Sequence, residues 1–256
     1  IDIKNYGSFR LNMSYFGYCD GFQMTNEKFH DLFGGQPRQS ESELTQREMD
    51  LAASIQTVIE ELVLGIAKNL AKETGMENLC LAGGVALNCV ANGILLKEKI
   101  FKNIWIQPAA GDAGGALGAA LSAWYLHYKN NRIISKDRDS MKGAYLGPSF
   151  TNEQIESELL DCGAVFQKLD EEDLIASTSN ALVDKKAVGW MQGRMEFGPR
   201  ALGGRSIIAD PRSPETQSQL NLKVKYRESF RPFAPSVLSE EVDKWFEIDV
   251  ESPYML

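Results

Sequence analysis

The sequence predicts an α/β protein built from two units. Two strand–glycine turn–helix patterns follow one another between about residues 78 and 127, which indicates parallel strands in a layered fold. A polar, charged stretch, Asn130 to Lys142, then precedes a second run of alternating helix and strand patterns and has the composition of a domain boundary. We therefore expect one domain over residues 1–130 and another over residues 143–256.

The first unit begins with about forty residues of short, irregular pattern. Thr45 and Glu48 form a capping box that opens a long helix, and Gly75 ends it. Apolar residues recur along this helix at close to a 3.6-residue period: Met49, Ala52, Ile55, Ile59, Leu62, Ile66 and Leu70. We then expect strands at Asn78 to Ala82 and Asn103 to Gln107, each followed by a helix, the first to about Ile100 and the second to about His127.

Glycines occupy the turn that follows each of these strands. Gly83 and Gly84 lead into the helix that carries Asn88, and Gly111 and Gly114 flank the start of the next helix. Glycine lets backbone N–H groups approach a ligand, and a helix N-terminus favours a phosphate there. An ordinary tight turn explains Gly83-Gly84 equally well, and the pair alone favours that interpretation.

Asp112 begins a helix directly after a strand, at the sheet edge where open α/β folds bind ligands. A carboxylate there can ligate a metal that bridges phosphates. It can also simply cap the helix, and without other ligands the cap is the simpler interpretation.

The second unit has a capping box at Thr151 and Gln154. The expected elements that follow are a helix from Thr151, a strand at Ala164–Lys168, a helix at Glu172–Asp184, strands at Ala187–Met191 and Arg205–Ala209, a helix from about Pro214, a strand at Ala234–Leu238 and a helix at Glu240–Phe246.

Composition restricts the class of protein. The 256 residues contain no apolar run of about 20, so we expect no membrane span. The four cysteines form no C-x-x-C pair, and we expect them to be reduced, buried residues of a cytoplasmic protein: Cys19, Cys80, Cys89 and Cys162. His30 and His127 lie in no ligand spacing, and we expect each to be structural or exposed.

Charge is distributed unevenly along the chain, whose net charge is −8. Between Trp190 and Phe233, six arginines and two lysines face four acids, a local balance of +4, so the other residues carry −12. A broad nucleic-acid surface is not expected on such a chain. A positive island in an acidic chain instead favours a small anionic ligand.

Four of these arginines are interleaved with glycines and apolar residues: Arg194, Arg200, Arg205 and Arg212. Guanidinium groups bind phosphate or carboxylate with paired hydrogen bonds. Their partners are either Glu196 and Asp210, in a structural ion-pair network, or a substrate. The density of glycine favours the substrate.

Lys223, Arg227 and Arg231 recur every four residues, which places them on one face if the segment is helical. An exposed basic helix face is the alternative, and the flanking Phe230 and Phe233 favour partial burial. No serine or cysteine nucleophile has a histidine in a suitable pattern, so the expected chemistry is positioning and charge neutralisation.

Gly193-Arg-Met-Glu-Phe-Gly-Pro-Arg-Ala-Leu-Gly-Gly-Arg-Ser-Ile-Ile-Ala-Asp-Pro-Arg212, with Lys223-x3-Arg-Glu-x-Phe-Arg-Pro-Phe-Ala-Pro235, closely resembles the carboxy-terminal domain of the NodU/CmcH carbamoyltransferase family. Gly83–Asn88 and Pro108–Ala120 resemble the end of that family's amino-terminal domain. The resemblance covers essentially the whole chain. The arginine-bearing stretch is specific, whereas the two glycine turns alone are not.

The resemblance implies the end of an actin-like ATPase (Kae1-like) domain followed by a YrdC-like α/β domain. The second domain would bind carbamoyl phosphate and ATP and form carbamoyladenylate. The first would hold the adenylate beside a divalent metal of the iron type, with magnesium as the alternative, and pass the carbamoyl group to a hydroxyl-bearing acceptor. No membrane or nucleic-acid partner is implied, and oligomerisation stays open.

Site residues carry over from the resemblance in three groups. The residues that match the carbamoyl phosphate and ATP pocket are Arg194, Arg200, Arg205, Lys223, Arg227 and Arg231. Those that match the nucleotide-binding turns are Gly83, Gly84, Asn88, Gly111 and Gly114, and Asp112 matches the metal-ligating aspartate.

Two departures from the family pattern matter. The early histidine pair that completes the metal site and the stretch that follows the match to residues 252–256 are not in this sequence. We therefore expect a fragment with partial or no activity by itself. The rival functions are a carbamoyl-adenylate-forming enzyme of tRNA modification, a non-catalytic nucleotide-binding module, and an actin-like sugar kinase, which gives no reason for the arginines.

Overall fold

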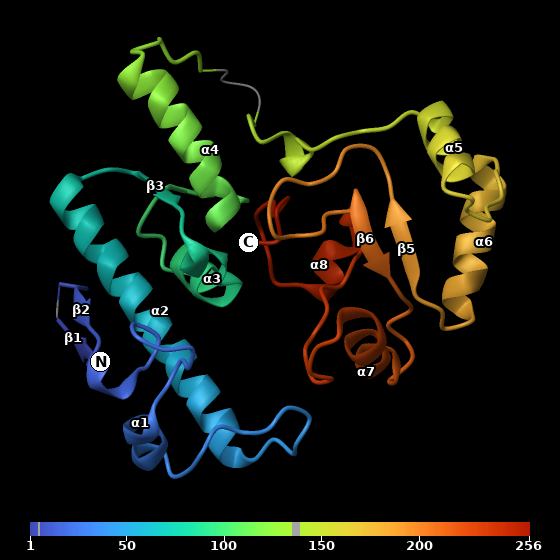
Figure 1. Ribbon diagram of the computed structural model, residues 1–256. Coiled ribbons are helices and arrows are strands. Elements are labelled where there is room, and N and C mark those ends of the chain that lie inside the picture. Colours follow the sequence, from blue (N-terminus) through green and yellow to red (C-terminus); the bar gives the residue numbers. More distant parts are fainter. Residues whose placement is uncertain (5, 135–138) are drawn as a thin grey trace. The chain divides into compact units, whose positions relative to one another are not determined.

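Three separate two-stranded sheets and eight α-helices make up the described part of the computed structural model, which covers residues 1–4, 6–134 and 139–256 (Figure 1). The mixed α/β class is therefore as predicted. The chain divides into two compact units, one of Ile1–Leu81 with Val85–Ile106 and one of Ala82–Gly84 with Gln107–Leu256. The domain bounds 1–130 and 143–256 stay a prediction.

The first unit opens with a short antiparallel pair that the sequence patterns did not indicate. Strands β1 (Asp2–Ile3) and β2 (Phe9–Arg10) pair in register, and helix α1 (Glu27–Leu32) follows. Asn26 caps α1, because its side-chain oxygen accepts from the backbone N–H of Phe29.

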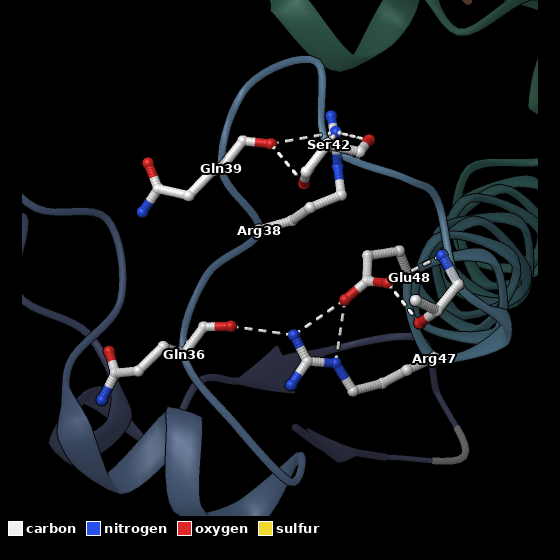
Figure 2. A network of polar contacts seen from close by, with 7 residues as sticks. Gln36, Arg38, Gln39, Ser42, Arg47 and Glu48 are labelled. Carbon is white, nitrogen blue, oxygen red and sulfur yellow. Dashed lines mark hydrogen bonds and ion pairs between the residues drawn. The ribbon is translucent and has the colours of Figure 1, made fainter.

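Helix α2 (Gln46–Thr74) has the ends that its sequence predicts. The Thr45 backbone N–H donates to Glu48 Oε2 over 3.1 Å, which completes the capping box, and Gly75 ends the helix in the left-handed conformation. Figure 2 shows how Arg47 extends this network: it donates to Glu48 and to the carbonyl oxygen of Gln36. The preceding loop is thereby tied to the first turn of the helix.

Strands β3 (Asn78–Leu81) and β4 (Asn103–Ile106) are parallel, as the repeated strand–turn–helix pattern predicts. Helix α3 (Cys89–Lys97) lies between them in sequence and packs on α2. A core of buried apolar side chains joins these elements: Ala67, Leu79, Leu95 and Phe101. The helix predicted after Gly83-Gly84 is not continuous: it begins as a 3-10 turn, Gly84–Leu87, and α3 follows from Cys89.

In the second unit, helix α4 (Asp112–Ser122) continues into a π-helical turn, Ala123–His127. The expected linker Asn130–Lys142 contains residues 135–138, which lie outside the described residues, and residues 130–134 form no regular element. Helices α5 (Asn152–Asp161) and α6 (Glu171–Val183) follow, and α5 has the predicted capping box at Thr151.

Strands β5 (Val188–Met191) and β6 (Arg205–Ile208) form an antiparallel pair, with Trp190 opposite Ser206 (Figure 1). A small core combines residues that come before, between and after the two strands in the sequence. Its buried members are Met141, Ala144 and Tyr254, and Leu117, Phe197, Leu202 and Leu256 pack against them. The Tyr254 hydroxyl bonds to Asp139 and accepts from the Gly143 backbone N–H, so the last residues close this core.

Several expected elements of the second unit are wrong. Residues 164–168 and 234–238 are not strands. Val165 is fully exposed, and prolines at 232 and 235 remove backbone donors that a ladder needs. The two other expected helices are present with different bounds. The helix expected from about Pro214 is α7 (Thr216–Gln219) followed by a π-helical turn, Leu220–Lys225, and the helix expected at Glu240–Phe246 is a 3-10 turn, Ser239–Glu241, followed by α8 (Val242–Trp245).

The cysteine prediction is wrong in one respect. All four thiols are free, as expected, but all four are exposed rather than buried. Cys80 shows why: it follows the buried Leu79 in a strand, where neighbouring side chains point to opposite faces. Of the two histidines, His30 is buried with its Nε2 3.2 Å from Thr25 Oγ1, and His127 is exposed.

Among the described residues, no helix is both long enough and apolar enough to cross a lipid bilayer.

Candidate anion-binding site

The loop between β5 and β6 carries the glycine–arginine stretch. The Gln192 backbone N–H donates to the Gly204 carbonyl over 2.9 Å, which extends the strand pair by one step. The segment after Gly193 pairs on its other side with residues 144–148, through Gly147 N–H to Met195 O at 2.9 Å and Phe197 N–H to Ala144 O at 2.7 Å. Backbone bonds therefore hold the loop on two sides.

A hollow of about 370 Å³ opens on this loop, and we call it the arginine hollow. Its lining is Tyr145, Gln192, Gly193, Arg194, Gly203 and Gly204. Arg194 is exposed, and its Nη1 donates to the Gly147 carbonyl over 2.9 Å. A guanidinium has five N–H donors, so this bond orients Arg194 and leaves donors for an anion.

Glu196 lies beneath the same loop and is 5% exposed. Its Oε1 accepts from the backbone N–H groups of Leu202 at 2.7 Å, Gly204 at 2.8 Å and Arg205 at 3.1 Å. Burial raises the pKa of this carboxyl, but the three N–H donors outweigh burial and leave the pKa below the ordinary glutamic acid value. Glu196 is therefore a charged, buried anchor for the turn.

The N–H groups of two glycines in this loop have protein partners. Gly204 donates to Glu196, and Gly203 donates to Ser206 Oγ over 3.1 Å. The glycine at 204 serves close packing instead, because a Cβ there would lie 2.6 Å from the Arg194 carbonyl oxygen. Side chains rather than these two amides must then supply the anion contacts.

The remaining arginines of the stretch have different surroundings. Arg205 is exposed in β6 opposite Met191, and Arg200 is half-buried near Pro108, Gly198 and Tyr254. Arg212 forms an ion pair with Asp210, with Nη2 2.6 Å from Oδ2 and Nε 2.9 Å from each oxygen. Hydrogen bonds from Arg212 lower the pKa of Asp210 to about 2. The structural ion pair considered for this stretch thus exists at Arg212.

Lys223, Arg227 and Arg231 do not share a helix face, which corrects the helical interpretation of their spacing. The π-helical turn ends at Lys225, and Tyr226 has a left-handed backbone with φ of 49°. Asn221, which is fully buried, holds the chain that follows: its Nδ2 donates to the Ser229 and Arg231 carbonyls at 3.0 and 2.7 Å. Lys223 and Arg231 are exposed.

Arg227 is partly committed to the fold. Its Nε donates to Asn221 Oδ1 over 2.6 Å, and its guanidinium lies over the Phe233 ring at 4.8 Å from the centroid. The partial burial predicted for this segment is present at Arg227 and Phe233, whereas Phe230 is exposed. Through these contacts, Arg227 helps to position the loop that carries Arg231.

The two glycine turns lie side by side where the sequence predicted neighbouring strand ends. The Gly83 N–H donates to the Ala110 carbonyl over 2.8 Å, and Gly83 has φ of 98°. Gly111 caps α4, and a Cβ at Gly114 would overlap the Ala109 carbonyl oxygen. Gly84 has open space around it.

Asn88 does structural work. Its Oδ1 caps α3 by accepting from Ala91 N–H at 3.1 Å, and its side-chain amide exchanges hydrogen bonds with Gln56 of α2 at 2.9 and 3.2 Å. The proposed nucleotide contact of Asn88 is therefore left without support from its side-chain bonds.

Asp112 is exposed and is the first residue of α4, one position after the cap. Within residues 1–4, 6–134 and 139–256, no group of three or more histidine, cysteine or acidic side chains is placed to hold a metal ion. The described donor set therefore does not fit a metal site, and the metal stays a prediction.

The sequence patterns missed three residues of this site. Tyr145 donates to the Leu202 carbonyl, 57 positions away, and Gln192 lines the hollow. Asn221 is a fully buried residue that hydrogen-bonds to Ser229, Arg231 and Arg227, and the charged residues that follow it in the sequence did not indicate its burial. None of these three residues had a sequence signal. Glu196, an acid among apolar residues, was identified from the sequence as a possible partner for an arginine.

Comparison with known proteins gives two family matches. Residues 1–121 match the family described as carbamoyltransferase N-terminus, and residues 179–256 match carbamoyltransferase C-terminus. An uncharacterized protein of Synechocystis sp. is 62% identical over 258 residues, which is 100% of this chain and 42% of that protein.

Two named relatives are more distant. Nodulation protein NolO of Bradyrhizobium diazoefficiens is 43% identical over 216 residues, 83% of this chain and 38% of the relative. Nodulation protein U of Sinorhizobium fredii is 32% identical over 232 residues, 89% of this chain and 38% of the relative. The chain thus spans less than half the length of these relatives.

Proposed function

The chain belongs to the carbamoyltransferase family, and from that premise we propose that it takes part in ATP-dependent O-carbamoyl transfer. Carbamoyl phosphate and ATP are the proposed substrates of the arginine segment, and a hydroxyl-bearing small molecule is the proposed acceptor. We also propose the Kae1-like and YrdC-like folds for the two domains, and a reducing cytoplasmic setting, which the four free thiols support.

The proposed chemistry has two balanced steps. Carbamoyl phosphate, ATP and water give carbamoyladenylate, pyrophosphate and inorganic phosphate. The acceptor oxygen then attacks the carbamoyl carbon, AMP leaves with the bonding electron pair, and the hydroxyl proton is released. In both steps negative charge develops on the phosphate oxygens of a leaving group, which fits a site built on positioning and charge neutralisation.

One observation carries this proposal: Arg194 stands at an open hollow with its direction set by the Gly147 carbonyl. Held in this way, a guanidinium binds phosphate oxygens with little further loss of side-chain freedom. Arg194 belongs to the segment Trp190–Phe233, whose charge balance of +4 in a chain of net charge −8 favours an anionic substrate. The assignment of individual phosphates to Arg200, Arg205, Lys223, Arg227 and Arg231 stays a prediction.

The nucleotide contacts of Gly83, Gly84, Gly111 and Gly114 also remain predictions. Their support is the Gly83–Ala110 hydrogen bond, which places the two turns side by side. A metal ligated by Asp112 also stays a prediction.

Pyrophosphate release from ATP in the presence of carbamoyl phosphate tests the proposal. We compare the chain with Arg194→Gln and with Arg212→Gln, whose arginine is engaged by Asp210. Loss of a charge-assisted phosphate contact should lower the rate for Arg194→Gln by about tenfold or more. Arg212→Gln should stay within about twofold of the unmodified chain.

Equal loss in both variants, with equal loss of thermal stability, would show an effect on folding and contradict the assigned role of Arg194. If the unmodified chain releases no pyrophosphate, calorimetric titration with each substrate decides the binding claim. Absence of binding to both carbamoyl phosphate and ATP would refute the proposed function for this chain.

A further inference from the structure

Glu196 occupies a position that an external anion often fills. Successive backbone N–H groups in a glycine-rich turn make a concave site for an anion. Here the N–H groups of Leu202, Gly204 and Arg205 all converge on one oxygen of the protein's own carboxylate. The turn therefore carries an internal anion that is 5% exposed.

The bonds of this turn connect it directly to the arginine hollow. Gly203 and Gly204 line the hollow together with Gly193 and Arg194. The Gly204 carbonyl accepts from Gln192, and a Cβ on Gly204 would meet the Arg194 carbonyl at 2.6 Å. The position of the turn thus sets the separation between the two chain segments that form the hollow.

We propose that Glu196 is a positioning residue for the phosphate-bearing substrate: its carboxylate holds the Leu202–Arg205 turn so that Arg194 and the two glycines form a hollow of fixed width. The proposal rests on the proposed function, because it names a residue that prepares the same site. Glu196 itself does not contact the substrate, since its Oε1 already accepts from three backbone N–H groups and its Oε2 is buried.

Charge is what makes the carboxylate effective in this position. Hydrogen bonds to an ionised acceptor are about twice as strong as neutral ones. The second oxygen, Oε2, is buried with no hydrogen-bond partner among the described residues. In Glu196→Gln the amide must place its NH₂ group either there, without an acceptor, or toward the three backbone donors. Both arrangements loosen the turn while keeping the size of the side chain.

The change in anion affinity in Glu196→Gln should have opposite signs for two possible roles of Glu196. Removing a negative charge close to an anion site should strengthen anion binding if Glu196 acts only through its field. Removing the anchor of the turn should weaken binding if Glu196 acts by positioning. The direction of the change therefore separates the two roles.

Calorimetric titration with carbamoyl phosphate, and separately with inorganic pyrophosphate, measures this change. The comparison uses the unmodified chain, Glu196→Gln, and Glu215→Gln as a matched control, because Glu215 is exposed in the same basic segment. We expect Glu196→Gln to bind about fivefold or more weakly, the effect of losing a charged hydrogen-bond acceptor. Glu215→Gln should bind as tightly as the unmodified chain or slightly more tightly.

Hydrogen exchange of the Leu202, Gly204 and Arg205 amides provides a readout that is independent of the ligand. These amides should exchange faster in Glu196→Gln by a larger factor than the β5 amides, because the loosening is local to the Leu202–Arg205 turn. If Glu196→Gln unfolds, Glu196→Asp replaces it, because it keeps the charge and shortens the reach by one methylene.

The outcomes are distinguishable. Unchanged or tighter binding in Glu196→Gln overturns the positioning role, and so does unchanged exchange of the three amides. Binding of neither ligand by the unmodified chain overturns the substrate part of this proposal, and the proposed function is refuted only if ATP also fails to bind. In that case faster exchange still supports the anchoring of the turn by Glu196.

Discussion

At the scale of single residues, the acids of the arginine stretch have two different tasks. Asp210 pairs with Arg212, whereas Glu196 bonds to three backbone N–H groups. The sequence placed both acids near arginines and left ion pairing and substrate binding as alternatives. The alternatives apply to different residues: Arg212 has an acidic partner within the loop, and Arg194 stands at an open hollow with a carbonyl as its orienting partner.

The Asp210–Arg212 pair predicts a pH dependence of stability. The pKa of Asp210 is about 2 in the folded chain, below the ordinary value of 3.8. Its contribution is therefore present above about pH 4 and is lost as the pH falls through the interval between these two values. We expect the difference in unfolding midpoint between the unmodified chain and Asp210→Asn to be constant near neutral pH and to shrink below pH 4.

Denaturant unfolding at a series of pH values measures this difference. Arg212→Gln should give the same pH profile, and the double variant should show no further loss, because both changes remove one interaction. A difference that persists undiminished at the lowest pH would contradict the assignment to this pair.

At the scale of elements, the glycines of α4 have unlike surroundings although they lie in one short run. A Cβ at Gly114 would overlap the Ala109 carbonyl, whereas a Cβ at the exposed Gly118 would meet nothing within 4 Å. Gly114 therefore lets the loop after β4 fold back on the helix start. Gly118 carries only the ordinary entropic cost of glycine in a helix.

Alanine substitutions in α4 should accordingly have opposite effects. Gly118→Ala should raise the free energy of unfolding by about 0.5–1 kcal/mol, the difference in helix propensity. Gly114→Ala should lower it by about 1–3 kcal/mol, because the backbone must shift to admit the methyl group. Chemical denaturation of both variants, followed by circular dichroism, measures the two changes, and a shared sign would contradict this account.

In the segment after α7, the buried Asn221 fixes the path of the chain through its hydrogen bonds. Its buried amide donates to two carbonyls and accepts from Arg227 Nε. Asn221→Ala leaves these groups without their partner and should lower the free energy of unfolding by about 1–3 kcal/mol. Asn180→Ala, at an exposed position of α6, is the control and should change it by less than about 0.5 kcal/mol. Similar losses in the two variants would refute the role of Asn221 as a hub.

At the scale of the whole molecule, the chain combines a net charge of −8 with a segment of +4. We therefore expect an anionic substrate to be attracted to this segment and repelled by the acidic remainder of the chain. Attraction of this kind acts through solvent and weakens as salt screens it.

Salt should therefore reduce the affinity for pyrophosphate. We expect calorimetric affinity to fall several-fold as potassium chloride is raised from dilute to physiological concentration, where the screening length is about 8 Å. Arg194→Gln should show a shallower dependence, because one of the attracting charges is gone. An affinity that does not vary with salt in the unmodified chain would argue against the electrostatic account of the site.

Local sequence signals predicted the elements whose ends depend on neighbours in the chain. The capping boxes at Thr45 and Thr151 and the glycine at Gly75 are formed by residues within four positions of one another, so their patterns were sufficient. The strands predicted at 164–168 and 234–238 are not formed, because a short apolar run becomes a strand only when another strand pairs with it. The prediction that Lys223, Arg227 and Arg231 share a helix face was wrong, because the helical turn ends at Lys225 and Tyr226 has a left-handed backbone.

By itself, the sequence determined the mixed α/β class, the principal helix ends, the parallel pairing of β3 with β4 and, through the arginine-bearing stretch, the family. Only the tertiary structure decided which polar groups remain available to a ligand. Tyr145 donates to the Leu202 carbonyl from 57 positions away, and Glu196 accepts from the Gly204 amide. The physical reason is that a hydrogen-bond donor is used or left open by whatever the folded chain brings within about 3 Å of it, and that is a property of the path of the chain rather than of spacing.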